Sequence, residues 1–69
     1  MNMTWRPKPG ERVRVRRFKT FPAFNAVVIK EISIAGGLLV TGYNIRDQDG
    51  REWFRKKSEM KPGWVGDPS

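Results

Sequence analysis

The sequence predicts a small all-β domain of five short strands, with a single 3₁₀ turn near the C-terminus. Valine and arginine alternate in "ERVRV", which is the period of a half-buried strand, and β-branched residues dominate "AVVIKEISI". Asp49-Gly50 stands between two runs of alternating hydrophobicity and marks a tight hairpin. No stretch keeps the i, i+3, i+4 apolar spacing of a helix, and 69 residues suffice for one core only.

The first strand is expected to begin at Glu11, because the prolines of the preceding "RPKPG" disfavour regular structure. Val13 and Val15 are expected to point to one side of this strand, and Arg12, Arg14 and Arg16 to the other. The alternation breaks over residues 16–18, as it would at a strand end or bulge. The next segment, "KTFPAFN", is too aromatic for a plain solvated turn, and we expect part of it to fold over the core.

The second and third strands are predicted at residues 26–34 and 38–45, joined by a turn at "AGG". The register of the second strand is ambiguous around Lys30-Glu31, where two charged residues are adjacent. Gly42 lies inside the third strand and indicates a bend or a bulge there.

The fourth strand, "REWFRKK", follows the Asp49-Gly50 turn and carries two adjacent aromatic residues. Successive side chains of a strand point to opposite faces, so Trp53 and Phe54 cannot both lie in the core. Ser58–Met60 is predicted to form the 3₁₀ turn, with Met60 directed inward, before the chain returns as a fifth strand.

The order of these elements resembles a small SH3-like barrel. The segments that match are "PGERVRV", "AVVIKEI", "DGREWFR" and "SEMKP", and the first of them is similar to the opening of KOW motifs. The resemblance implies a lead-in at residues 1–8, a five-stranded SH3-like barrel at 9–62 and a tail at 63–69. It also implies partners among nucleic acids or proteins of nucleic-acid machines, as in the KOW and Tudor-like branches.

Composition points to a basic intracellular protein with an anionic partner. The net charge is +7, and most of the excess lies in residues 1–19 and 55–61. The chain has no Cys and no His, which removes thiolate metal sites, disulfides and the commonest catalytic base. We therefore expect no enzyme activity, no metal and no cofactor. No apolar run is long enough to be a signal peptide or a membrane span, so a cytoplasmic location is expected.

The candidate site is a basic and aromatic surface. We expect the row of arginines on the first strand to face solvent, where guanidinium groups suit phosphates, and the basic run after the fourth strand to converge on it. Exposed rings beside these charges would stack on bases. The candidate binding residues are Arg12, Arg14, Arg16, Arg17, Arg55, Lys56, Lys57, Phe21, Phe24 and Trp53.

Each feature also has a structural explanation. Charged residues keep an exposed strand soluble, and a domain this small needs aromatic rings to fill its interior. The leading hypothesis is an accessory module that contacts the phosphate backbone of RNA or DNA with little sequence specificity. The alternative is a protein-interaction subunit that docks onto an acidic partner protein in a larger complex.

Overall fold

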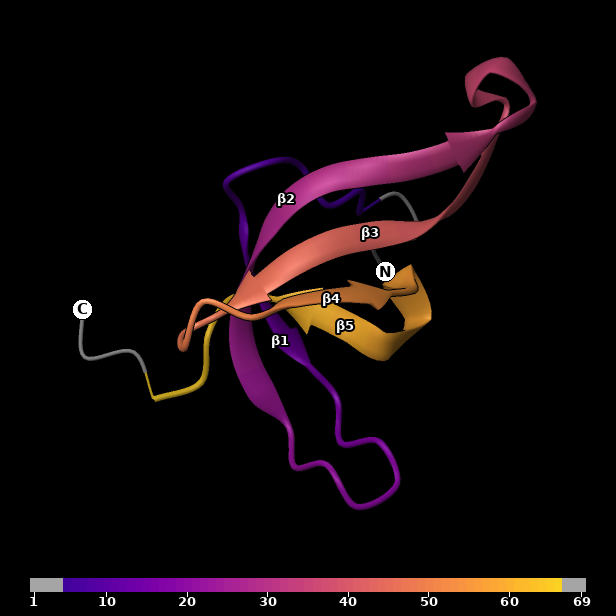
Figure 1. The fold of residues 1–69 in the computed structure, drawn as a ribbon. Helices are drawn as coiled ribbons and strands as arrows, with labels where there is room; N and C mark the ends of the chain where they lie inside the picture. Colours follow the sequence, from indigo (N-terminus) through magenta and orange to yellow (C-terminus); the bar gives the residue numbers. More distant parts are fainter. Residues whose placement is uncertain (1–4, 67–69) are drawn as a thin grey trace.

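Five antiparallel strands form one sheet in the computed structural model, which describes residues 5–66 (Figure 1). The order across the sheet is β4-β3-β2-β1-β5. The strands and the two 3₁₀ turns are β1 (Arg12–Val15), β2 (Phe24–Ile34), η1 (Ala35–Gly37), β3 (Leu39–Asp47), β4 (Glu52–Arg55), η2 (Lys57–Glu59) and β5 (Met60–Pro62).

The all-β prediction is confirmed, but two finer expectations are not. The sheet is not closed into a barrel, because the short edge strands β4 and β5 pair with β3 and β1 and not with each other. The structure also contains two 3₁₀ turns, whereas one was expected. The predicted turn near the C-terminus is η2, and the second is η1 at the "AGG" segment, where Gly36 adopts a φ of +66°.

β1 shows the alternation that its sequence predicts. Val13 and Val15 are completely buried, and the strand ends at Val15, just before residues 16–18, where the alternation of the sequence breaks. β1 lies between β2 and β5, so Arg14 stands opposite Asn25 on one side and Lys61 on the other. The first strand and the chain after the fourth strand are therefore neighbours in space.

β2 and β3 form a long hairpin that extends beyond the rest of the sheet and ends at η1 (Figure 1). Its register shifts twice, which leaves Ile29 without an opposite residue on β3 and Thr41 without one on β2. The first shift resolves the ambiguity near Lys30-Glu31, and the second confirms the irregularity expected at Gly42.

The core lies on one side of the sheet. Trp53 packs against it, whereas Phe54 keeps 44% of its surface exposed, so Phe54 is the aromatic of β4 that faces outward. Met60 points inward as expected. The buried residues are Val13, Val15, Ala26, Val28, Tyr43, Ile45 and Met60, and the partly buried residues against them are Trp5, Phe24, Val40 and Trp53.

Both flanking segments contact the sheet. The indole N–H of Trp5 donates a hydrogen bond of 2.7 Å to Glu11, and Pro7 is fully buried. In the segment that follows β5, the indole N–H of Trp64 donates a hydrogen bond of 2.7 Å to the carbonyl of Ala26. No helix within residues 5–66 is long and apolar enough to cross a membrane.

Candidate functional site

The two arginines of β1 have structural partners. The guanidinium carbon of Arg12 lies 4.5 Å from the centroid of the Trp64 ring, a cation–π distance. Arg14 donates a hydrogen bond of 3.0 Å from Nη1 to Oδ1 of Asn25. Asn25 in turn holds Val65 through both its amide and its carbonyl. These contacts fix Arg12 and Arg14 on the outer face of the sheet, beside the C-terminal segment.

Arg16 and Arg17 follow β1 and lie in a different environment. The backbone N–H of Arg16 donates to the carbonyl of Glu59 at 2.8 Å, which carries the β1–β5 pairing one residue further. This pairing brings both arginines to a cleft of about 130 Å³ beside Arg55. Within residues 5–66, neither guanidinium group of Arg16 and Arg17 forms a salt bridge. The cleft is lined by Arg16, Arg17, Phe18, Arg55, Ser58 and Glu59.

Arg55 is held between aromatic rings. Its guanidinium carbon lies 5.3 Å from the ring centroid of Phe18 and 5.1 Å from that of Trp53. Nη1 donates to the carbonyl of Phe54 at 2.8 Å, and the buried Nε has no hydrogen-bond partner in the described part of the chain. Stacking therefore positions this cation before any partner binds.

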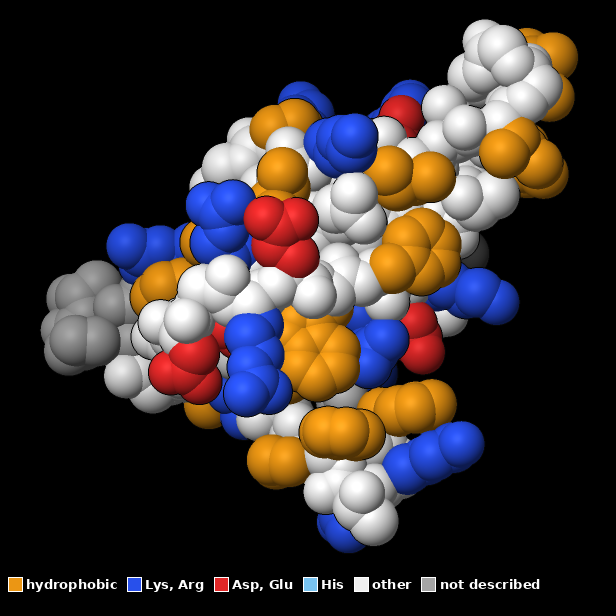
Figure 2. Space-filling view, in the orientation of Figure 1, with side chains coloured by type: hydrophobic (Ala, Val, Ile, Leu, Met, Phe, Trp, Pro, Cys, Tyr) orange, Lys and Arg blue, Asp and Glu red, His pale blue; other side chains and the backbone are white. Residues whose placement is uncertain are grey.

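The loop after β1 presents two exposed rings. Phe18 and Phe21 exchange backbone hydrogen bonds of 3.0 and 2.8 Å, and Lys19 between them takes a left-handed φ of +52°. Phe18 is 40% exposed and Phe21 50%. Figure 2 shows hydrophobic and basic side chains intermixed at the end of the molecule where this loop lies. The loop is a candidate stacking surface.

The other two predicted stacking residues serve mainly in packing. The rings of Phe24 and Trp53 lie 5.3 Å apart between centroids, and both residues are half-buried against the core. The rings of Phe21 and Trp53 form a T-shaped pair with 5.8 Å between their centroids. Phe18 was not among the predicted residues, although it is exposed beside Arg55. It lies where the β1 alternation breaks, so periodicity gave no signal for it.

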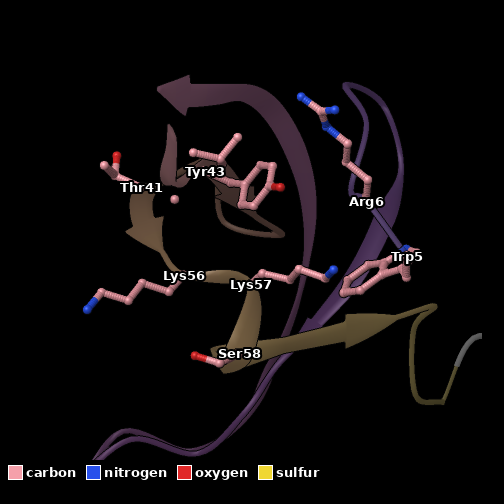
Figure 3. Close-up of a pocket in the computed structure, with 9 residues that line it drawn as sticks. Trp5, Arg6, Thr41, Tyr43, Lys56, Lys57 and Ser58 are labelled. Atoms are coloured by element: carbon pink, nitrogen blue, oxygen red, sulfur yellow. The ribbon is translucent and has the colours of Figure 1, made fainter. Parts of the chain in front are cut away.

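Lys56 and Lys57 do not share a cavity with the arginines after β1. They line a larger pocket of about 500 Å³ between β3, η2 and the segment before β1. In Figure 3, Lys57 extends toward the Trp5 ring, while Lys56 points away from it. The lining residues are Trp5, Arg6, Val40, Thr41, Gly42, Tyr43, Lys56, Lys57 and Ser58.

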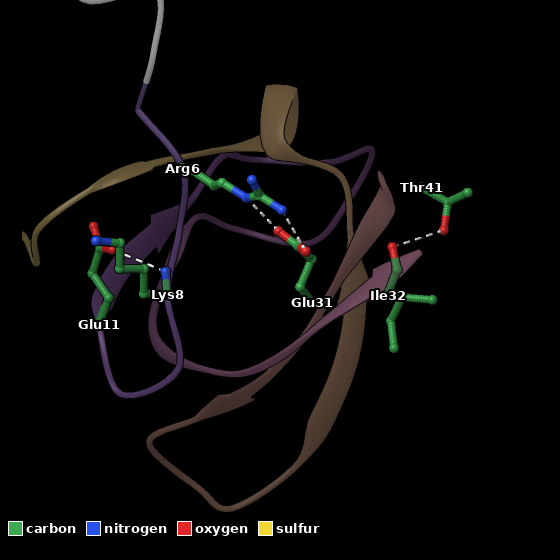
Figure 4. Close-up of polar contacts among 6 residues, drawn as sticks. All are labelled: Arg6, Lys8, Glu11, Glu31, Ile32 and Thr41. Carbon is green, nitrogen blue, oxygen red and sulfur yellow. Dashed lines mark hydrogen bonds and ion pairs between the residues drawn. The ribbon is translucent and has the colours of Figure 1, made fainter. Parts of the chain in front are cut away.

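An ion pair fixes the rim of this pocket. Arg6 donates two hydrogen bonds of 2.8 Å to the carboxylate of Glu31 (Figure 4). The hydrogen bond and charge of Glu31 raise the pKa of Arg6, and the hydrogen bond from Arg6 lowers the pKa of Glu31. Burial, aided by the Glu31 charge, raises the pKa of the Tyr43 hydroxyl. Tyr43 is therefore neutral at physiological pH.

Comparisons with protein-family models, curated protein sequences and solved structures give no match to this chain.

Proposed function

We propose that this protein binds single-stranded nucleic acid through the cleft between the loop after β1 and η2. The observation that carries the proposal is that Arg16 and Arg17 line one cleft with Arg55, which is distant from them in sequence, beside the exposed ring of Phe18. Three arginines line this cleft, and Glu59 is the one acidic residue among its lining residues. Such a surface suits phosphates, and the adjoining ring suits an unstacked base.

Single strands are favoured over duplexes by the aromatic loop. The rings of Phe18 and Phe21 project at the surface, and a base can stack on them only when it is free of a complementary strand. Arg12, Arg14 and Lys61 extend the positive charge along the outer face of β1 and β5. Sequence preference should be weak, because charge and stacking do not distinguish base edges.

The strand order also supports a proposal about the fold. We infer an open variant of the SH3-like barrel, supported by the order of five strands and by the 3₁₀ turn between β4 and β5. In that superfamily the KOW and Tudor-like branches bind nucleic acids or proteins of nucleic-acid machines. The resemblance agrees with the chemistry of the cleft.

The test is the salt dependence of binding to a short, labelled, mixed-sequence oligonucleotide. The double variant Arg16→Gln/Arg17→Gln removes two phosphate contacts, and its log–log slope should become shallower by about 1.4, at about 0.7 per contact for single strands. The matched control is Arg46→Gln/Arg51→Gln, which removes the same charge near the β3–β4 turn.

The control should keep the wild-type slope. A slope that is shallow from about 50 to 200 mM salt, or equal in both variants, would contradict the proposal. Retention of a protein partner after nuclease treatment, with no oligonucleotide binding, would instead support docking onto an acidic protein.

A further inference from the structure

The pocket beside Trp5 and Tyr43 is a second site, distinct from the cleft. Its volume of about 500 Å³ falls in the range of small-molecule sites, about 300–1,000 Å³. Two aromatic rings, three cationic side chains and three hydroxyl groups, one of them on Tyr43, line it, and none of its lining residues carries a carboxylate. We call it the Trp5–Tyr43 pocket.

The aromatic wall of this pocket is held in place. One carboxylate oxygen of Glu11 accepts the indole N–H of Trp5 at 2.7 Å. The other accepts the backbone N–H of Lys8 at 3.0 Å, and Figure 4 shows this second contact. Tyr43 is buried in the core on the opposite side. A ligand that stacks on Trp5 would therefore lose little free energy to ordering of the protein.

The charge of the pocket selects an anion. Arg6 is neutralised by Glu31, but the Lys57 ammonium has no ion-pair partner within residues 5–66. Lys57 extends across the pocket toward the Trp5 ring (Figure 3). A cationic ligand would meet this ammonium group unfavourably. A ligand with a flat ring and a nearby phosphate would satisfy both Trp5 and Lys57.

We propose that the Trp5–Tyr43 pocket binds one unpaired nucleotide, with its base against Trp5 and its phosphate on Lys57. This inference rests on the proposed function, because the nucleotide belongs to the strand that occupies the cleft. Ser58 lines both cavities, so the two sites adjoin across η2. A strand bound at the cleft needs only to pass η2 to place its next base in the pocket.

The experiment follows the indole N–H signals of the three tryptophans by nuclear magnetic resonance, with the Trp5 signal assigned through Trp5→Phe. The probes are adenosine monophosphate, inorganic phosphate and a short oligonucleotide. Adenosine monophosphate should shift the Trp5 signal and leave those of Trp53 and Trp64 unchanged. Inorganic phosphate should shift the backbone signals of η2 and of the loop after β1 but not the Trp5 signal, and the oligonucleotide should shift both the Trp5 signal and those of the loop after β1.

A matched pair of variants tests the phosphate contact. Lys57→Glu should weaken binding of adenosine monophosphate at least tenfold. Lys30→Glu makes the same charge change at an exposed position of β2, outside the lining of the pocket, and should weaken it less than twofold. Equal losses in the two variants would mean that only net charge matters, and would overturn the proposal.

The remaining outcomes separate this inference from the proposed function. If the oligonucleotide shifts the signals of the loop after β1 but not that of Trp5, the pocket proposal is wrong and the proposed function stands. If adenosine monophosphate shifts Trp5 but no oligonucleotide binds, the pocket takes a free nucleotide and the proposed function fails. If inorganic phosphate reproduces every shift, the base plays no part and the pocket proposal is overturned.

Discussion

The ring of Phe54 lies so close over Gly42 that a β-carbon added to Gly42 would stand 2.4 Å from the Cζ atom of Phe54. Gly42 belongs to β3 and Phe54 to the adjacent edge strand β4. An aromatic ring that covers a glycine on a neighbouring strand is a known device for stabilising sheets. Here the Phe54 ring, which faces away from the core, packs against the backbone of Gly42.

The first prediction concerns this contact. Gly42→Ala should destabilise the protein by about 1–3 kcal/mol, because the new methyl group must displace the Phe54 ring. The backbone at Gly42 does not have a positive φ, so alanine itself is tolerated there. Urea unfolding, followed by tryptophan fluorescence, measures the free energy of unfolding.

The control is the same substitution without the ring. In a Phe54→Ala background, Gly42→Ala should cost less than about 0.5 kcal/mol or even stabilise, since alanine restricts the unfolded chain. An equal cost in both backgrounds would show that the ring is not the obstacle.

The second prediction concerns Asp47 and pH. One carboxylate oxygen accepts the indole N–H of Trp53 at 3.0 Å, and the other accepts the backbone N–H groups of Asp49 and Arg51, each at 2.9 Å. These bonds, that from Trp53 foremost, lower the pKa of Asp47 below its ordinary value of 3.8. The charged form is thus favoured by folding.

The sign follows from proton uptake. Well above pH 3.8 the carboxylate is charged in both states and its contribution to stability is complete. As the pH falls below this value, the unfolded state binds the proton first, so stability decreases. The urea midpoint of Asp47→Asn should therefore fall less steeply with acidification than that of the wild type. Parallel curves for the two proteins would contradict this prediction. The pKa of Glu31 is also lowered, so adding Glu31→Gln to the Asp47→Asn variant should reduce the remaining pH dependence of stability further.

The third prediction separates the arginines of the first strand from those after it. Arg14→Ala should cost about 0.5–1.5 kcal/mol, because Arg14 loses its hydrogen bond to Asn25. Arg16→Ala and Arg17→Ala should change the free energy of unfolding by less than about 0.5 kcal/mol, since both side chains are exposed. Thermal unfolding of the three variants tests this. A loss at Arg16 or Arg17 as large as that at Arg14 would mean that the whole row is structural.

Much of the strand pattern could be predicted because its signals are local. The alternation around Val13 and Val15 and the turn at Asp49-Gly50 each depend on a few adjacent residues, and both are present in the structure. Whether the sheet closes is a different question, because it depends on which partners two short edge strands find. Hydrophobic periodicity carries no information on that choice.

Lys56 and Lys57 were among the predicted binding residues, but Trp5, a ring of the same pocket, was missed for a similar reason. Trp5 precedes two prolines, in a segment without hydrophobic periodicity, and its indole N–H is held by Glu11 across a turn. The available signal was size: so large an apolar side chain is seldom left exposed in so small a domain. The basic residues divide between two cavities, since Arg55 at the end of β4 lines the cleft and Lys57 in η2 lines the pocket. Sequence proximity alone does not reveal this division.

The last prediction tests stacking by the loop after β1. Phe18→Ala should weaken binding of single strands about 5- to 150-fold, since one stacked base is worth about 1–3 kcal/mol. The change should cost little stability, because Phe18 is 40% exposed and lies outside the core. Fluorescence anisotropy with a labelled oligonucleotide measures the binding.

Control variants test whether the effect of Phe18→Ala comes from the loss of the aromatic ring. Leu38→Ala removes a side chain that is 89% exposed at the far tip of the β2–β3 hairpin, and it should leave binding unchanged. Phe18→Tyr keeps the ring and should retain most of the affinity, as should Phe18→Trp. Because the Phe18 ring also contacts Arg55, a loss that Phe18→Tyr does not restore would mean that the residue does not act through its aromatic face.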